Sequence, residues 1–325
     1  MRQCGLLIIL LVLFTNVVHA QLDGARVNWP LPINTNIVTA TVVNGTANAS
    51  MSVFDRVQAD VDIDSDLYVL SYLRSQAILG RTVHWQALLP AGSQSTNSPL
   101  PLSTNRTYAD GLGDVSIGGT INLIGAPELP VREALRYEVD LNVSLGVLVT
   151  FPTGSYDKDE VLNMGSNRWS TRISLPIVKS LTDWVPARRT TLEVTPAVVF
   201  FGDNDNSVGS TIKQDPVYSV EAHLTRDMTS KAFISLDYTW IDGGDQAFTD
   251  NTTGLSAGAT SGLGAQLAGV TLGFKINDNL NLNLTHMQTI GESSDPFELN
   301  GSLTKVMLNW GWHDVLEPRR RSQGN

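Results

Sequence analysis

Charged side chains recur at every second position in several segments of this chain. Residues two apart lie on one face of a β-strand, so these segments would form ladders of charge along a sheet. If the opposite faces meet lipid, the ladders line an enclosed lumen, where carboxylates attract counter-ions and repel anions. The candidate lumen-lining residues are Asp60, Asp62, Asp64, Asp66, Glu138, Asp140, Arg168, Arg172, Glu193, Glu221, His223 and Asp237.

The spacing of the reactive side chains does not point to a catalytic or metal centre. The histidines after residue 20 form neither an HxH nor an HxxxH pair, so a metal site is unsupported, and no histidine is paired with a serine by spacing. Residues 203–206 place four oxygen-bearing side chains on one loop, which could hold calcium. They lack the spacing of a helical calcium loop, which favours a solvated turn. We therefore expect neither an enzyme nor a bound cofactor.

Alternation of apolar and polar residues is the main structural signal. It is clearest over residues 138–151, where apolar side chains on one face alternate with mostly polar ones on the other. A strand of about 14 residues exceeds the usual five or six of a globular sheet and can cross a bilayer when tilted. A second long run covers residues 57–73 and places the aspartates of residues 60–66 opposite its apolar face.

These two runs and the shorter ones predict twelve strands. The connections alternate between short and long, and outer-membrane barrels keep short turns and both chain ends in the periplasm. That rule requires an outward strand before residues 57–73, which we assign to residues 36–43, and the total becomes even. The other predicted strands are 80–90, 113–124, 168–178, 190–201, 216–225, 231–241, 269–276, 280–288 and 302–312.

The predicted fold class is therefore all-β, an antiparallel transmembrane β-barrel of about twelve strands. Aromatic residues near the predicted strand ends, such as Trp85, Trp169 and Trp310, would form interfacial girdles. A secreted soluble β-sandwich remains an alternative, because its strands also alternate. Its strands would be shorter, and its loop lengths would alternate less regularly.

The first twenty residues have the pattern of an export signal. Arg2 precedes an apolar core from Leu6 to Phe14, and small or modest side chains lead to a cleavage site after Ala20. The only cysteine, Cys4, would be removed with this signal. The remaining chain has 21 Lys and Arg against 32 Asp and Glu, a net charge of −11, so nucleic acid is not an expected partner.

Four short strings, in order along the chain, resemble a known family. They are Gly111-Leu-Gly113-Asp114, Phe151-Pro152-Thr153-Gly154, Asn167-Arg168-Trp169 and Phe201-Gly202-Asp203-Asn204-Asp205. With these strings, roughly residues 65–310 are similar to the outer-membrane proteins of the MetA-pathway of phenol degradation family. The resemblance implies an outer-membrane channel for aromatic or other hydrophobic compounds.

The motif residues also have structural interpretations that need no ligand. Gly154 and Gly202 stand where a strand gives way to a loop, and glycine tolerates the positive φ that such a turn often needs. Pro152 cannot donate to a strand ladder and would end the pairing. One feature departs from the family, whose barrels usually end on an aromatic residue that the assembly machinery reads: here Trp312 is followed by a basic segment.

These features together predict a signal peptide at 1–20, an N-terminal segment at 21–35, the barrel at 36–312 and a polar basic tail at 313–325. The expected function is passive uptake or export of small hydrophobic or aromatic compounds through a channel in the cell outer membrane. The expected partners are outer-membrane lipid, the barrel assembly machinery and such solutes. A structural or adhesive surface barrel and an outer-membrane hydrolase remain alternatives.

Overall fold

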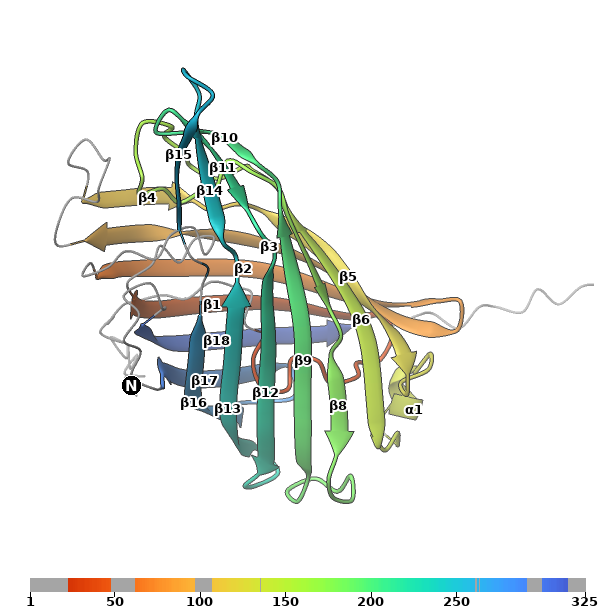
Figure 1. Ribbon diagram of the computed structural model, residues 1–325. Coiled ribbons are helices and arrows are strands. Elements are labelled where there is room, and N and C mark those ends of the chain that lie inside the picture. Colours follow the sequence, from red (N-terminus) through yellow and green to blue (C-terminus); the bar gives the residue numbers. More distant parts are fainter. Residues whose placement is uncertain are drawn as a thin grey trace, which may run out of the picture.

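The described part of the chain forms a closed antiparallel sheet with a smaller sheet at one end (Figure 1). The structure is a computed structural model that describes residues 23–47, 62–96, 107–134, 136–260, 262, 264–290 and 300–314. The predicted signal peptide and nearly all of the predicted tail lie outside the described residues. In these ranges no helix, including the single turn α1 (Val131–Ala134), is long and apolar enough to cross a membrane.

The strands of the barrel follow one another in sequence order, and β1 pairs with β18 to join the two ends of the sheet. Two positions in the wall each hold two strands in line. At one, β4 and β5 both pair with β3, and at the other, β7 and β8 both pair with β6 and β9. The strands are β1 (Thr35–Ala47), β2 (Ile63–Ile78), β3 (Arg81–Thr96), β4 (Tyr108–Leu112), β5 (Ser116–Ile124), β6 (Leu141–Thr150), β7 (Ser170–Ser174), β8 (Ile177–Ser180), β9 (Thr190–Phe201), β12 (Val217–Asp227), β13 (Ala232–Gly243), β16 (Ala265–Lys275), β17 (Leu280–Thr289) and β18 (Gly301–His313).

Counted by position in the wall, the barrel has twelve strands, which confirms the predicted fold class and strand number. Short turns lie at one end and long loops at the other. The turn between β2 and β3 is Leu79 and Gly80, whose φ angles of 51° and 72° are those of a tight hairpin turn. At the loop end, four strands that the sequence did not predict form a second sheet, which we call the outer sheet: β10 (Asn204–Ser207), β11 (Ser210–Gln214), β14 (Gln246–Asp250) and β15 (Ser256–Thr260).

The orientation of the barrel can be tested by cysteine labelling. A cysteine at Asp159, in the long loop before β7, is expected to react with a membrane-impermeant maleimide on intact cells. A cysteine at Asp278, in the short turn after β16, is expected to react only after the outer membrane is permeabilised. The two side chains are 66% and 93% exposed, so local burial does not separate them. Labelling of Asp278→Cys on intact cells would reverse the orientation.

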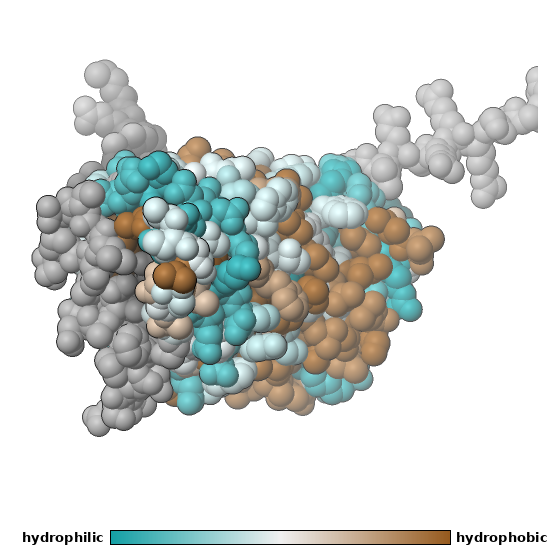
Figure 2. All heavy atoms as spheres, turned by 45° about the horizontal axis from the view of Figure 1, so that its top comes forward, coloured by the Kyte–Doolittle hydropathy of each residue, from teal (hydrophilic) through white to brown (hydrophobic). Residues whose placement is uncertain are grey.

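Large apolar side chains cover the outer surface of the wall. Leu70 and Leu236 lie in the middle of their strands on the outer face and are 55% and 59% exposed. Figure 2 shows a broad hydrophobic region on the wall, bordered by hydrophilic side chains. Soluble proteins rarely expose so large an apolar surface, whereas a barrel that crosses a membrane presents it to lipid. The chain is therefore a β-barrel of the outer membrane.

Aromatic side chains border this surface at both ends. Trp85 and Trp310 lie near the short-turn end, while Trp169 and Tyr218 lie near the loop end, and all four are about half exposed. Such positions are typical of interfacial girdles. Phe201 differs, because it packs against a buried cluster inside the barrel.

The prediction that the aspartates of β2 line the lumen is wrong. Leu67 is fully buried on the inner face, whereas Asp64 and Asp66 lie on the outer face at the loop end of the strand. There they accept hydrogen bonds from Thr46 Oγ1 at 2.7 Å and from Asn44 Nδ2 at 3.4 Å. The error came from the assumption that every apolar face meets lipid.

The length of β2 gives the physical reason. The strand has 16 residues, more than the roughly 9–11 that a tilted strand needs to cross a bilayer, so its first residues stand above the membrane. There the outer face meets water and can carry charge. Asp62 is exposed just before this strand, and Asp60 lies outside the described residues. A row of aspartates that makes the lumen cation-selective is not part of this barrel's described wall.

Glu138 and Asp140 also fall outside the lumen, because β6 begins at Leu141 rather than at residue 138. Both side chains are exposed at the short-turn end of the barrel. Asp140 forms an ion pair with Lys179 there, with 83% of its side chain exposed. The two carboxylates belong to the rim of the barrel and not to its interior.

Candidate functional site

Six of the predicted lumen-lining residues lie inside the barrel, and five of them form what we call the charged layer. They are Arg172 on β7, Glu193 on β9, Glu221 and His223 on β12, and Asp237 on β13, each 7% exposed or less. Arg172 Nη2 lies 3.3 Å from Glu221 Oε1, and His223 Nδ1 lies 2.8 Å from Asp237 Oδ1. Pairing of this kind is required, because an unpaired buried charge is strongly destabilising.

Residues 23–34, which precede β1, fold into the lumen and contact the charged layer. The backbone N–H of Asp23 donates to Glu221 Oε2 at 2.9 Å. The indole N–H of Trp29 donates to Glu193 Oε1 at 2.8 Å. The segment therefore fills part of the lumen and covers carboxylates that would otherwise face water.

Arg26 holds the same segment against the short-turn end of the wall. Its guanidinium lies 2.6 Å from Asp227, which also binds Arg189 at 2.8 Å. The Arg26 guanidinium also lies over the rings of Trp29 and Phe233, 4.4 and 4.0 Å from their centroids. Cation–π attraction of this kind adds to the ion pair.

Sequence reasoning missed these partners of the charged layer. Asp227 continues the alternation of Glu221 and His223 along β12, so extending that run by four residues would have found it. Asp23 and Arg26 lie outside any periodic segment. Their partners on the wall are up to 201 residues away in the sequence, so no local signal connects them.

A layer of buried apolar side chains crosses the lumen at the loop end. Eight strands of the wall contribute to it, and Met164 enters it from the long loop between β6 and β7. Its members, each 8% exposed or less, are Ala47, Leu67, Met164, Val199, Val217, Ile241, Ala265, Leu267, Met287 and Leu303. We call this cluster the outer apolar layer. An ion would lose its hydration in such a layer, whereas an apolar solute would not.

Asp114 holds the loop that carries Met164. Asp114 Oδ1 accepts a hydrogen bond from the Gly154 N–H at 2.7 Å. Asp114 Oδ2 accepts one from the Ser166 N–H at 2.8 Å and another from the Ser166 hydroxyl. The carboxylate therefore ties together the two ends of the loop segment, and we call these contacts the loop clasp.

Glycines allow this loop to pack closely against the adjoining backbone. A Cβ added at Gly154 would come within 2.8 Å of backbone atoms of Gly113 and Gly165. A Cβ added at Gly111 would collide with Ser155 Oγ. Gly111 also has a φ of 136°, which side-chain-bearing residues rarely adopt. These motif positions are explained by packing of the loop.

The other residues of the same motifs surround the loop clasp. Thr153 Oγ1 accepts a hydrogen bond from the β4–β5 connection at 3.0 Å, and Pro152 is exposed just beyond β6. The Phe151 ring packs edge-on against Trp169, with centroids 4.8 Å apart. The Gly202 N–H donates to the Trp169 carbonyl at 2.8 Å.

Arg168 and the acidic loop after β9 lie at the loop end of the barrel. Arg168 is 2% exposed, lies over the Phe201 ring at 4.7 Å and hydrogen-bonds Gln214. It is therefore buried at the top of the lumen, beside the outer apolar layer. Asp203 forms a 3.4 Å ion pair with Lys213, and Asp205 is exposed on β10.

Replacing Asp114 with alanine is expected to loosen the loop and raise ion leakage through the outer apolar layer. The change removes an acceptor of hydrogen bonds to a charged group, each worth about 1.5–3 kcal/mol. Protease sensitivity of the loop on intact cells and conductance in planar bilayers measure the effect. Asp203→Ala, which removes only an exposed ion pair, is the control. Unchanged protease resistance and leakage in Asp114→Ala would contradict this role.

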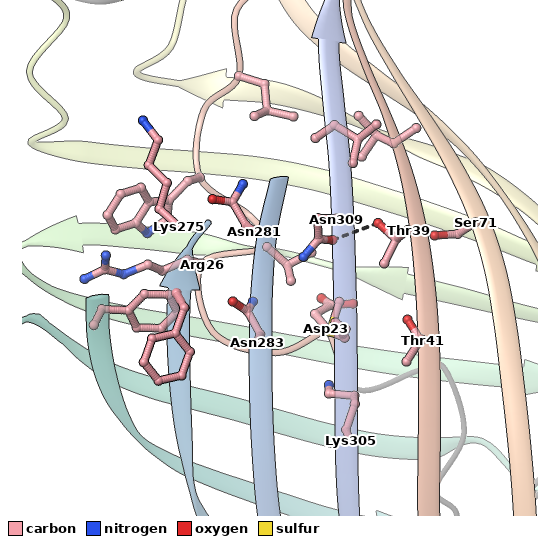
Figure 3. A pocket seen from close by; sticks show the side chains of 18 of the residues that line it. Asp23, Arg26, Thr39, Thr41, Ser71, Lys275, Asn281, Asn283, Lys305 and Asn309 are labelled. Atoms are coloured by element: carbon pink, nitrogen blue, oxygen red, sulfur yellow. Dashed lines mark hydrogen bonds between the residues drawn. The ribbon is translucent and has the colours of Figure 1, made fainter. Parts of the chain in front are cut away.

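A cavity of about 400 Å³ lies between the N-terminal segment and the wall at the short-turn end. Trp29 and Leu31 line it from the segment, and Phe274 lines it from β16. Strands β17, β18, β1 and β2 contribute threonine, serine and asparagine side chains, several of which Figure 3 shows around one space, and β3 contributes Gln86 and Leu88. Charged side chains, among them Asp23, Arg26 and Lys305, complete the lining. The volume and the mixed lining are those of a small-molecule site.

The buried histidine is not arranged as part of a nucleophile triad. His223 hydrogen-bonds Asp237, but Ser235 donates to the same carboxylate rather than to the imidazole. Residues 254–258 have the GxSxG spacing, which the sequence reasoning overlooked. Their serine, Ser256, is exposed at the start of β15 and not at a strand-to-helix turn. Within the described ranges, no three His, Cys, Asp or Glu residues are grouped to hold a metal ion.

Two carboxylates outside the membrane-spanning strands have lowered pKa values. In the outer sheet, hydrogen bonds from the Thr253 backbone and hydroxyl hold the pKa of Asp250 below its usual value. At the opposite end, the hydrogen bond from Lys275 lowers the pKa of Asp278. Both groups are exposed, so these shifts stabilise surface turns and do not involve the lumen.

Solved structures similar to this chain include the following three. An outer membrane channel from Pseudomonas putida F1 has a TM-score of 0.66 at 19% identity, covering 88% of this chain and 98% of that chain. The β domain of the Bordetella autotransporter BrkA has a TM-score of 0.46 at 9% identity, with coverages of 85% and 98%. The P. putida toluene transporter TodX has a TM-score of 0.44 at 10% identity, with coverages of 88% and 92%.

At these identities the likeness to the Pseudomonas putida F1 channel concerns the fold alone. No curated protein sequence matches the chain significantly. A family model does match: the one described as "Putative MetA-pathway of phenol degradation" covers residues 41–301, from within β1 to the first residue of β18. This match includes all four motif strings and confirms the resemblance drawn from them. The chain belongs to this family.

Proposed function

We propose that the chain is an outer-membrane channel for the passive movement of small hydrophobic or aromatic compounds. The observation that carries the proposal is the lumen, which holds the outer apolar layer at the loop end and, toward the short-turn end, a cavity lined by apolar, uncharged polar and charged side chains. A general porin has a water-filled polar lumen. A buried apolar layer instead raises a barrier to ions and leaves little barrier to uncharged, weakly hydrated solutes.

The comparisons support the same function. The similar Pseudomonas putida F1 structure is that of an outer membrane channel, and the family description refers to the degradation of phenol, an aromatic compound. The direction of movement follows the concentration gradient, because a passive channel does not supply energy. The compound that moves in the cell depends on which solutes are present and on which ones the lumen accepts.

Uptake measurements test this function. Cells with the chain are expected to take up small uncharged aromatic compounds faster than cells without it. Thr41→Trp, which fills part of the cavity from β1, is expected to reduce uptake, whereas Thr253→Trp in the exposed turn between β14 and β15 is the matched control. Uptake that depends neither on the chain nor on Thr41→Trp would contradict the channel and favour a surface barrel that only displays its loops.

We also propose that the chain is not an enzyme and that the barrel assembly machinery inserts it. Asp237 holds His223 in the lumen, and among the described residues no serine hydroxyl bonds to that imidazole, which supports the first point. The pairing of β18 with β1 supports the second, because the edges of the sheet must be closed onto each other before the barrel can lie in lipid. Hydrolysis of ester substrates by the purified barrel would contradict the non-enzyme proposal.

A further inference from the structure

The wall of the cavity carries a row of uncharged hydrogen-bonding side chains. Asn281 on β17, Asn309 on β18, Thr39 on β1 and Ser71 on β2 are direct partners across neighbouring strands. Asn283 lies two residues along β17 from Asn281, and all five line the cavity. In Figure 3 these side chains surround one space. We call these five residues the amide–hydroxyl row.

Part of the amide–hydroxyl row is available to a solute. Thr39 Oγ1 donates to Asn309 Oδ1 at 2.8 Å, as the dashed line in Figure 3 marks. In the part of the chain that the structure describes, the side chains of Asn281 and Asn283 bond to no other protein group. Each primary amide carries two donors and an acceptor, which water or a bound solute must satisfy.

The surroundings of the row are apolar or already charge-balanced. Trp29 and Leu31 present apolar surface from the N-terminal segment. Six cations of the described residues also line the cavity. Arg26 and Arg189 share Asp227, Arg172 pairs with Asp23 and Glu221, and Lys275 pairs with Asp278. Lys305 is buried near Glu221 and Asp23, and Lys231 is exposed near Asp278. A solute therefore meets an apolar side, an uncharged polar side, and cations that each have a carboxylate nearby.

We propose that this cavity binds uncharged amphipathic solutes that join an apolar ring or chain to a hydroxyl or carbonyl group. The inference rests on the proposed function and names its solute class. A plain hydrocarbon that displaces water from the row would leave the Asn281 and Asn283 amides unsatisfied, which costs affinity. A carboxylate would bring an excess charge into a site whose cations are paired, and it would lose its hydration.

Binding of three matched probes tests the preference. Benzyl alcohol, ethylbenzene and phenylacetate share a benzyl group and differ in the group attached to it. We expect the full mature barrel in lipid vesicles to bind benzyl alcohol about tenfold more tightly than either of the others, the size of one or two neutral hydrogen bonds. Equilibrium dialysis measures this, and protein-free vesicles give the correction for partition into lipid.

A double variant assigns the preference to the row. Asn281→Leu with Asn283→Leu is expected to lose the preference for benzyl alcohol and to bind ethylbenzene at least as well as before. Asn206→Leu, at an exposed position on β10, is the matched control and should keep the preference. Migration of unheated samples in electrophoresis shows whether each variant has folded, because a folded barrel runs faster than a boiled one.

The outcomes separate this inference from the proposed function. Equal binding of benzyl alcohol and ethylbenzene, tighter binding of phenylacetate, or an unchanged preference in the folded double variant would overturn the inference. If the binding preference holds but none of the three compounds crosses vesicle membranes more quickly with the protein, the proposed channel function is wrong and the proposed solute class is supported. If the uncharged probes cross faster with the protein but at equal rates, and bind with equal affinity, the channel function is supported and the proposed solute class is wrong.

Discussion

Replacing Leu145 with arginine is expected to destabilise the folded barrel by about 2–4 kcal/mol, which is the cost of a cation at the middle of a lipid-facing strand. Leu145 lies midway along β6 on the outer face and is 38% exposed. A guanidinium there must remain in hydrocarbon or draw water and headgroups toward itself. Reversible unfolding in urea, with the barrel in lipid vesicles and folding followed by electrophoretic mobility, measures the loss.

Leu255→Arg provides a matched control for this change. Leu255 is 69% exposed in the outer sheet region, between β14 and β15, where the side chain meets water. Its replacement is expected to change stability by no more than about 0.5 kcal/mol, as at most exposed surface positions. Equal losses for both variants would show that arginine acts through something other than lipid contact. No loss for Leu145→Arg would show that this face of β6 does not meet the membrane.

Asn142 on the same strand shows that a position on the lumen-facing side of β6 does not by itself decide whether an arginine is tolerated. Its position on the polar face of β6 suggests that an arginine would be tolerated there. In the structure Asn142 is 2% exposed and hydrogen-bonds Asn122 of β5, so the larger side chain would have no room. We therefore expect Asn142→Arg to be poorly tolerated. A lumen position tolerates a long side chain only where it borders a cavity.

The strands were predictable because one requirement acts on all of them. Lipid demands an apolar side chain at every second residue of the outer face, and that pattern is local in the sequence. The prediction of residues 190–201 coincides with β9, and that of 280–288 misses one residue of β17. The alternation of short and long connections then required a twelfth strand, which was assigned to the segment that forms β1. This step needed no knowledge of the contacts between residues that are distant in the sequence.

The lumen was harder to predict because no single requirement acts on its face. Along β9, the inner face changes from Glu193 in the charged layer to Val199 in the outer apolar layer within six residues. On β2, the inner face at the loop end is apolar, so alternation alone assigned Asp64 and Asp66 to the wrong side. The N-terminal segment has no periodicity, and its contacts are set by packing inside the closed barrel.

The lumen contains two barriers in series, and this arrangement predicts a strongly non-additive effect on ion conductance. The outer apolar layer closes the loop end around Met164. The N-terminal segment, residues 23–34, fills the other end through contacts such as that of Arg26 with Asp227. An ion must cross both barriers, so removing one leaves the conductance limited by the other.

Two changes remove the barriers separately. Met164→Asp places a carboxylate, with its hydration, in the outer apolar layer, and deletion of residues 23–34 empties the short-turn end. Each change alone is expected to raise single-channel conductance only slightly. Together they are expected to raise the conductance on the order of tenfold. Lowering the second barrier by about 1.4 kcal/mol affects the conductance only when the first barrier no longer limits it. Planar-bilayer recordings compare the unchanged chain, Met164→Asp, the deletion and the two changes combined. Electrophoresis first shows that each protein has folded.

Met228→Asp is the matched control for the substitution. Met228 is 63% exposed just after β12 at the short-turn end, so a carboxylate there is expected to leave conductance unchanged with or without the deletion. A full rise on deletion alone would show that the outer apolar layer does not resist ions, and a full rise with Met164→Asp alone would show that the N-terminal segment does not. Uptake of uncharged aromatic compounds should change far less than ion conductance across the same variants, because a dry apolar layer resists ions and not solutes that carry little hydration.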